Sequence, residues 1–403
     1  MGNPPYFIIA KTQKNNQYSN LKRSHKTYIS PEILEKYKKY YSSDAKQINI
    51  FNLFIEHGIN HLRENGYLGF IIPDIFLAGN TSQKIREYIL NTCSIQQISK
   101  ISDQVFEDGG INNIILILKR EKNQNKRNNN MIKIKNMLIN EIKNKKSSEI
   151  NYIKQEIFVN LPYNNFSINI DQNSWNEIGF IFHKIANKQV LPLQKLVNIQ
   201  RGIEIGKKNS RIITAEKAHL LNSNNSNLQI GKIIATENVC PFRIDYKNKN
   251  FNNMYVIFDP YNKGIFKDEK IYKSPKILLK RISDKLIAAI DMNGEYYCLD
   301  SIQILNLKPN IKYDLFYLLG VLNSEFLNKY YHLIFGGYKK LFARVNKSYL
   351  KNLPIPKVSL ENQLQVANIV RKLIEIENNY TAQFLEMKTK VDKIIYSHYL
   401  YSK

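Results

Sequence analysis

Cysteine is scarce in this chain of 403 residues, which contains only Cys93, Cys240 and Cys298, far apart in the sequence. Three isolated cysteines supply neither a disulfide framework nor the paired ligands of a zinc site, so we expect no metal and a reducing, cytoplasmic location. Long apolar runs are also lacking. The most apolar stretch, residues 67–79, is interrupted by a proline and an aspartate and is too short to span a bilayer. The first residues, MGNPPYFIIAKT, lack the basic and apolar regions of a signal peptide.

Acidic residues are few in comparison with basic ones. The chain has 34 Asp and Glu against 59 Lys and Arg, a formal net charge of +25. A surplus of this size favours a polyanionic partner such as a nucleic acid. The chain is also rich in Lys, Asn and Ile together, as AT-rich coding sequences produce, so the charge alone does not decide the matter. With 43% hydrophobic residues, the composition is that of a globular protein of two or three domains.

The first third of the chain alternates between helical and strand patterns. Ser30 and Pro31 are typical of a helix start, and residues 49–64 show apolar residues at helical spacing. Residues 67–73, YLGFIIP, are continuously apolar, which predicts a strand buried on both faces as in a parallel sheet. Residues 81–91 predict a further short helix.

A β-hairpin is expected next. Its strands would be IQQISKI (95–101) and NNIILILKR (112–120), with Gly109 and Gly110 in the turn. Residues 121–154 are then rich in Lys and Asn, and their low complexity predicts a solvated basic linker or insertion.

A second region, 155–356, mixes short strands with helices. The strands include 276–282 and 302–307, and a helix is expected over 315–334. The last region, 357–403, predicts one long helix, roughly residues 360–396, with apolar residues along one face.

The sharpest chemical signal is Asn3-Pro4-Pro5-Tyr6. An aromatic exocyclic amine is a poor nucleophile because its lone pair is delocalised into the ring. A site that accepts hydrogen bonds from both amino hydrogens frees that lone pair for methylation. The side-chain carbonyl of Asn3 and the backbone carbonyl of Pro4 can supply the two acceptors, and two prolines stiffen the loop before reaction. Tyr6 offers a face for stacking a base flipped out of a duplex. A turn with a short polyproline segment is the other interpretation of this tetrapeptide.

The tetrapeptide does not stand alone. Residues 1–120 resemble the catalytic half of the N6-adenine DNA methyltransferases of the Taq type and their type IIG restriction-modification relatives. The resemblance rests on the order and spacing of four segments, which are GNPPY, NIFNLFIEHGINHLRENGYLGFIIPDIFL, KIREYIL and VFEDGGINNIILILKR.

The resemblance implies roles for individual residues. Asn3, Pro4, Pro5 and Tyr6 match the catalytic loop of the family. Phe106 matches the aromatic residue that covers the other face of the flipped adenine, although a residue of the hairpin core is the alternative. Ile50 and Phe54 match positions that pack against the adenine ring of the methyl donor S-adenosylmethionine. An ordinary apolar helix face explains these two equally well.

The second region resembles the target-recognition domain of the same enzymes, over residues 196–209, 277–291, 296–307 and 318–356. The implied partner is double-stranded DNA, and most of its contacts would be to phosphates, which fix register but not sequence. For any one candidate, a solvated surface charge is the alternative. The candidates for DNA contact are Arg201, Lys207, Lys208, Arg281, Tyr338, Lys339, Lys340 and Arg344.

Other patterns are weaker. GIEIGKK (202–208) has the wrong glycine spacing for a P-loop and no Ser or Thr after the lysine. His57 and His61 lie four residues apart but have no evident third ligand, so a partly solvated helix face is expected rather than zinc. The sequence KDEK (267–270) lacks the acidic strand of a metal-dependent nuclease, and no nuclease domain is predicted.

The predicted fold is therefore α/β. An incomplete Rossmann-like methyltransferase domain (1–120) is followed by the linker (121–154), a mixed α+β target-recognition domain (155–356) and a C-terminal helix (357–403). In the family, a Gly-rich loop and an acidic residue that hold the donor precede the catalytic loop, so we expect a partner polypeptide to carry that N-terminal half. We also expect residues 67–73 to form an exposed edge without that partner.

The leading hypothesis is an adenine-specific DNA methyltransferase of a restriction-modification system that is active when complemented. The alternatives are a non-enzymatic DNA-specificity module, an inactive truncated remnant, and an amino-methyltransferase acting on RNA or on a protein glutamine. The long C-terminal recognition region argues against the last of these.

Overall fold

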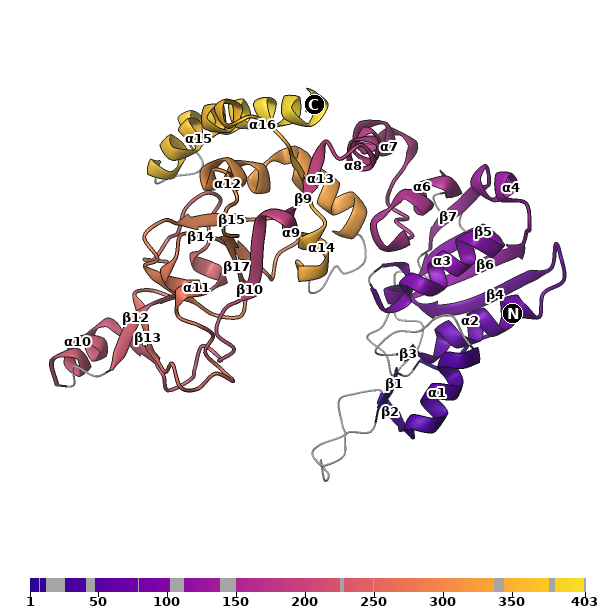
Figure 1. Ribbon diagram of the computed structural model, residues 1–403. Helices are drawn as coiled ribbons and strands as arrows, with labels where there is room; N and C mark the ends of the chain where they lie inside the picture. Colours follow the sequence, from indigo (N-terminus) through magenta and orange to yellow (C-terminus); the bar gives the residue numbers. More distant parts are fainter. Residues whose placement is uncertain are drawn as a thin grey trace. The chain divides into compact units, whose positions relative to one another are not determined.

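The computed structural model divides into two compact units. Unit 1 comprises Met1–Glu177 with Leu333–Tyr338, and unit 2 comprises Ile178–His332 with Lys339–Lys403. Figure 1 shows unit 1 mainly in indigo and purple and unit 2 from magenta to yellow. The residues that the structure describes are 1–6, 8–11, 26–40, 48–78, 80–101, 112–137, 150–224, 228–248, 250–336, 344–376 and 381–401.

A five-stranded sheet forms the framework of unit 1, with strand order β4-β6-β5-β7-β8. Strands β5 and β7 pair in parallel, and the other three neighbouring pairs are antiparallel. The strands are β4 (Tyr67–Pro73), β5 (Cys93–Ile101), β6 (Asn113–Arg120), β7 (Met131–Met137) and β8 (Ile150–Lys154). A smaller sheet, ordered β2-β1-β3, is made of β1 (Ile8–Lys11), β2 (Lys26–Ile29) and β3 (Ile48–Asn49). The helices are α1 (Pro31–Tyr40), α2 (Ile50–Asn60), α3 (Gln83–Thr92), α4 (Gln124–Asn128), α6 (Gln155–Asn160) and, at the boundary, α7 (Gln172–Ile178).

Branched apolar side chains hold α3 against this sheet. Ile85 and Ile89 of α3 are buried, as are Ile114 and Leu116 of β6. Arg86 is also fully buried, and its guanidinium donates to the carbonyl oxygens of residues 76, 163 and 164, at 2.7 to 3.0 Å. A buried cation needs such acceptors, because an unpaired charge in the core is strongly destabilising.

The hairpin prediction is confirmed, since β5 and β6 pair antiparallel along their length. Its expected turn lies outside the described residues. The expectation that strand 67–73 is buried on both faces was wrong, because β4 pairs antiparallel with β6 and much of it is only partly buried. Within the linker prediction, β7 and β8 belong to the sheet, and α4 precedes them. The buried side chains of Ile132 and Ile134 explain why this Lys-rich segment packs as a strand.

Unit 2 contains two four-stranded sheets, ordered β10-β17-β14-β15 and β11-β13-β12-β16, and a pair formed by β9 and β18. Apolar side chains from both large sheets share one core, which includes Ile233, Val256, Leu278 and Ile304. The strands are β9 (Val190–Pro192), β10 (Val197–Arg201), β11 (Ile212–Thr214), β12 (Gln229–Ile234), β13 (Met254–Phe258), β14 (Lys276–Lys280), β15 (Ala288–Asp291), β16 (Tyr296–Cys298), β17 (Ile302–Leu307) and β18 (Pro354–Pro356).

The helices of unit 2 are shorter than the sequence predicted. The expected helix over 315–334 breaks at Ser324, whose hydroxyl accepts from the backbone N–H of Leu327 and starts a new helix. The terminal helix is likewise divided in two, because α15 ends at Glu375 and α16 begins at Ala382. The helices are α8 (Phe180–Ala186), α9 (Leu193–Leu196), α10 (Ala215–Asn224), α11 (Lys270–Lys273), α12 (Leu315–Asn323), α13 (Glu325–Tyr331), α14 (Lys347–Lys351), α15 (Leu360–Glu375) and α16 (Ala382–Tyr401).

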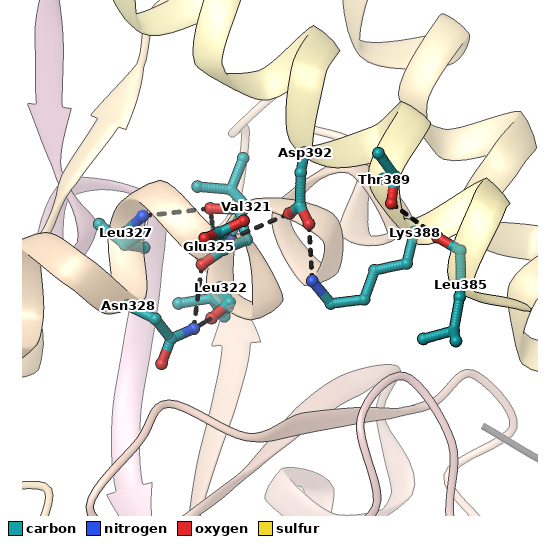
Figure 2. Close-up of polar contacts among 10 residues, drawn as sticks. Val321, Leu322, Glu325, Leu327, Asn328, Leu385, Lys388, Thr389 and Asp392 are labelled. Carbon is teal, nitrogen blue, oxygen red and sulfur yellow. Dashed lines mark hydrogen bonds and ion pairs between the residues drawn. The ribbon is translucent and has the colours of Figure 1, made fainter. Parts of the chain in front are cut away.

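The terminal helices are joined to the rest of unit 2 by polar contacts as well as by packing. The Asp392 carboxylate of α16 accepts from the backbone N–H of Glu325 at 3.0 Å and pairs with Lys388 at 2.6 Å (Figure 2). A carboxylate at this position satisfies an N–H at the start of α13 that has no partner within its own helix. Asp392 therefore fixes α16 against the break between α12 and α13.

Candidate active site and nucleic-acid interface

The predicted catalytic loop begins as an extension of the main sheet of unit 1. The N–H of Gly2 donates to the carbonyl of Gly69 at 2.9 Å, and the N–H of Ile71 donates to the carbonyl of Gly2 at 3.1 Å. This is the pattern of a parallel bridge between Gly2 and Phe70. A Cβ atom at residue 2 would lie 2.6 Å from Cε1 of the Phe70 ring, so any larger residue there would require the Phe70 ring to move. Gly2 therefore determines where the loop leaves the sheet.

Tyr6 holds the other end of the loop on the same strand. Its hydroxyl donates to the carbonyl of Ile71 at 3.0 Å, and partial burial raises the pKa of Tyr6 to about 12. Pro4 is buried between the two anchors, whereas the side chains of Asn3 and Pro5 are exposed. An amide acceptor is thus presented to solvent from a loop that is stiffened by two prolines and fixed at both ends.

The other residues predicted for this site lie in different surroundings. Phe54 is 45% exposed on α2, whereas Ile50 is 8% exposed at the start of the same helix. An exposed aromatic ring can stack on a purine, and a buried isoleucine can support the helix that carries it. Phe106 lies outside the described residues.

Three of the predicted DNA contacts, Arg201, Lys207 and Lys208, lie at the end of β10 and just after it, and all three are exposed. Arg201 is 3.8 Å from the Glu204 carboxylate, a long ion pair in solvent. Lys207 is paired with Glu237 and lies 5.7 Å from the centre of the Phe251 ring. Arg201 and Lys208 are therefore better placed for a phosphate than Lys207.

Arg281 and Arg344 are brought together by the backbone. Ile282 and Arg344 form an antiparallel bridge, and the N–H of Val345 donates to the carbonyl of Arg281 at 2.8 Å. The two guanidinium groups differ, because that of Arg281 is bonded to the carboxylate and carbonyl of Asp300 while Arg344 is exposed. Tyr338, Lys339 and Lys340 lie outside the described residues.

Two cations that the sequence did not single out lie beside Arg201. The ammonium group of Lys267 donates to the backbone carbonyl of Arg201. Partial burial lowers the pKa of Lys267; the Glu204 carboxylate opposes this shift, and the charges of Arg201 and Lys347 add to it. Burial, with the charges of Lys351 and Arg201, also lowers the pKa of Lys347. In the sequence, Lys267 is notable only as part of KDEK, and no local pattern relates it to Lys347, because the two lysines come from distant parts of a Lys-rich chain.

A pocket of about 670 Å³ in unit 2 contains none of the predicted site residues. Its wall includes Tyr313, Phe316 and Arg371, and the Arg371 guanidinium lies 4.4 Å from the centre of the Phe316 ring and 3.0 Å from the Asp314 carboxylate. The same Asp314 carboxylate accepts from two N–H groups at the start of α12. The polar groups at this wall are therefore already engaged with one another.

Within the described ranges, no group of three or more His, Cys, Asp or Glu side chains is arranged to hold a metal ion. None of the helices in those ranges combines the length and the apolar character needed to cross a membrane.

Two segments match known families. Residues 1–106 match the Eco57I restriction-modification methylase, and residues 231–355 match the TaqI-like C-terminal specificity domain. The type II restriction enzyme and methyltransferase RM.Eco57I of Escherichia coli is 33% identical over 126 residues, 31% of this chain and 11% of that protein. The putative type II restriction enzyme and methyltransferase RM.MjaORFECS2P of Methanocaldococcus jannaschii is 26% identical over 99% of this chain and 31% of its own length.

A solved structure, the type IIL restriction-modification enzyme MmeI in complex with DNA, superposes with a TM-score of 0.57 and 11% identity. The match covers 88% of this chain and 50% of that one, and at this identity it shows a shared fold. The chain thus spans about a third or less of the two curated relatives described above. Residues 1–106 are therefore similar to the Eco57I restriction-modification methylases and residues 231–355 to the TaqI-like C-terminal specificity domain, and both curated relatives are type II restriction enzymes and methyltransferases by name.

Proposed function

We propose that this chain provides the catalytic loop and the DNA-specificity domain of an N6-adenine DNA methyltransferase. The observation that carries the proposal is the attachment of residues 2–6 to β4 through Gly2 and Tyr6, which leaves the Asn3 amide exposed between the two anchors. The family of residues 1–106 supports a methyltransferase role, and the family of residues 231–355 supports a role in recognising DNA.

The reaction follows from the acceptors in this loop. The side-chain carbonyl of Asn3 and the backbone carbonyl of Pro4 would each accept a hydrogen bond from the adenine amino group. These bonds draw the nitrogen toward tetrahedral geometry and make its lone pair available for attack. The Tyr6 ring would stack on the flipped adenine, with Phe106 as the proposed second face, and stacking offsets part of the cost of extruding the base.

S-Adenosylmethionine would supply the electrophilic methyl group. The exposed ring of Phe54 fits a role against the purine of the donor, and Ile50 would support α2 from within the core. We propose that a second polypeptide, or a longer form of the chain, contributes the remaining donor contacts. Nucleophile and donor must be held in line, and correct positioning of this kind accounts for a large part of the barrier reduction in group transfer.

The experiment combines the full chain, alone and with the N-terminal half of a related enzyme, with tritiated S-adenosylmethionine and duplex DNA. We expect label in N6-methyladenine, and we expect Asn3→Ala to reduce it by about two orders of magnitude or more, since one preorganised polar contact is worth roughly that much. Asn222→Ala, at an exposed position on α10, is the matched control and should leave the rate unchanged.

Label in RNA or in protein instead of DNA would overturn the choice of substrate. Binding of duplex DNA with no label under any complementation would favour a non-enzymatic specificity module. Equal activity of the Asn3→Ala variant and wild type would remove Asn3 from the mechanism.

A further inference from the structure

The feature that leads beyond the proposed function is a short segment of unit 2, Arg344–Lys347, which we call the strap. It crosses the end of the sheet ordered β10-β17-β14-β15. The Gln303 side-chain amide of β17 donates to the carbonyl of Val345 at 2.6 Å, and the N–H of Val345 donates to the carbonyl of Arg281, just after β14, at 2.8 Å. Val345 itself is buried, with 1% of its surface exposed. Two hydrogen bonds and one buried side chain therefore fix the strap over two strands.

The same sheet end carries Arg201. Arg201 and Gln303 are paired residues of β10 and β17, so the strap crosses next to Arg201 through its bond to Gln303. Lys267 arrives from the segment before α11 and donates to the carbonyl of Arg201. Arg201, Lys267 and Lys347 thus come from three segments that are separated by more than sixty residues each in the sequence.

The Glu204 carboxylate offsets part of the positive charge of these three cations. Within the described residues, the nearest ion pair is the 3.8 Å contact between Arg201 and Glu204, and neither Lys267 nor Lys347 pairs with an acidic side chain. Burial lowers the pKa of both lysines; Arg201 and Lys347 add to this effect at Lys267 and Glu204 opposes it, while Lys351 and Arg201 add to it at Lys347. Exposed Arg344 adds a further positive charge at the start of the strap. Several like charges held together with a single opposing carboxylate create a net local field that attracts an anion.

We propose that Arg201, Lys267 and Lys347 form a preassembled binding surface for the phosphodiester backbone of duplex DNA. In this proposal Arg281 is a positioning residue, because its side chain is committed to Asp300 and its carbonyl holds the strap. The inference rests on the proposed function, which makes duplex DNA the substrate, and it adds Lys267 and Lys347 to the residues that contact it. Contacts of this kind set affinity and orientation uniformly for all sequences.

The test measures binding of the full chain to a fluorescent DNA duplex over a range of salt concentrations, with wild type and the double variant Lys267→Gln/Lys347→Gln. Each phosphate contact contributes a slope of about −0.9 in log K against log salt, so losing two should reduce the slope by about 1.8 and the affinity by roughly fiftyfold near 0.1 M salt. The loss should be equal for duplexes of unrelated sequence. The matched control, Lys217→Gln/Lys390→Gln, removes the same charge from exposed positions on α10 and α16 and should change the slope much less.

A second measurement separates binding from folding. If the lysines serve the structure, their removal should lower the midpoint of thermal unfolding. If they are held together for an anion, removal relieves repulsion, and the midpoint should stay or rise while affinity falls. A double variant with unchanged affinity and slope would overturn the phosphate surface while leaving the methyltransferase proposal intact. Absence of DNA binding by wild type at low salt would overturn both.

Discussion

The two proposed sites of this chain use different physical means to hold a nucleic acid. The loop of residues 2–6 is positioned by neutral groups, through the backbone of Gly2 and the hydroxyl of Tyr6 on β4. The surface of Arg201, Lys267 and Lys347 relies on net charge, and its geometry comes from the strap. Neutral hydrogen bonds depend steeply on distance and angle, whereas attraction between charges varies gently and is screened by salt. We therefore expect the loop to be sensitive to steric change and insensitive to salt, and the strap surface to behave in the opposite way.

The largest effect is expected when the loop is displaced. In Gly2→Val, the new side chain would meet the Phe70 ring, because even a Cβ atom would lie 2.6 Å from Cε1. The complemented enzyme should lose methyl transfer by tenfold or more, while its affinity for DNA and the salt dependence of binding stay unchanged. Radiolabel transfer and DNA titration on the same preparations measure the two effects.

A rescue experiment provides the control for this change. In Gly2→Ala/Phe70→Leu, the smaller side chain at residue 70 makes room for the added Cβ atom, so activity should recover relative to Gly2→Ala alone. If neither Gly2→Val nor Gly2→Ala affects methyl transfer, the bridge between Gly2 and β4 is unimportant for the reaction.

An intermediate effect is expected for Arg281→Met, which tests the division between positioning and contact. The variant loses the hydrogen bonds to Asp300 at 2.9 and 3.1 Å, and we expect a decrease of about 1–2 kcal/mol in the free energy of unfolding. The slope of log K against log salt should change by much less than the value of about 0.9 for one phosphate contact. Urea unfolding and salt titration provide the data. If the slope of log K against log salt instead falls by about 0.9 and the free energy of unfolding does not change, Arg281 is a phosphate ligand.

The smallest effect, and the most specific one, concerns the hydroxyl of Tyr6. Tyr6→Phe keeps the ring for stacking but loses the hydrogen bond to Ile71, at a cost of about 0.5–1.5 kcal/mol in unfolding free energy at pH 8. The folded-state pKa of Tyr6 is raised to about 12, above the ordinary value of 10. Its contribution to stability is therefore complete below pH 10 and is lost as the pH rises toward 12.

The difference in stability between wild type and Tyr6→Phe should accordingly narrow above pH 10, as measured by urea unfolding at pH 8 and at about pH 11. All the other tyrosines are common to both proteins, so the comparison isolates this hydroxyl. A constant difference across this range would show that Tyr6 ionises in the same way in the folded and unfolded chain.

Local sequence pattern predicted part of this architecture. Two strand-like segments on either side of a Gly-Gly turn predicted the hairpin of β5 and β6, and the position of Ser30 before Pro31 predicted the start of α1. The period-two pattern of MIKIKNM was also present in the sequence, but its lysines and the low-complexity segment before it favoured a linker. The break at Ser324 was not evident, because the segments 315–322 and 326–331 on its two sides are rich in apolar and aromatic residues that continue a helical pattern.

The candidate sites were predictable to different degrees for the same reason. Asn3 to Tyr6 are contiguous, so their chemistry can be recognised in the sequence. The strap that carries Lys347 is held by the buried Val345, by a hydrogen bond from the Gln303 side chain and by one backbone hydrogen bond, whereas Lys267 is bound to the carbonyl of Arg201. Contacts between such distant segments depend on the tertiary structure, so no local sequence pattern predicts them.

The bond from Tyr6 to Ile71 has one more consequence. A carbonyl on the outer side of an edge strand normally accepts the amide of the neighbouring chain, and here a phenol occupies that position in place of a peptide group. Pro4 has no N–H to continue the pairing, so backbone pairing stops after a single bridge and the Tyr6 hydroxyl takes the free carbonyl. The number of residues between Gly2 and Tyr6 is thus fixed by their two attachments to β4. Inserting even one residue between them would move the Asn3 amide away from the adenine amino group that we propose it binds.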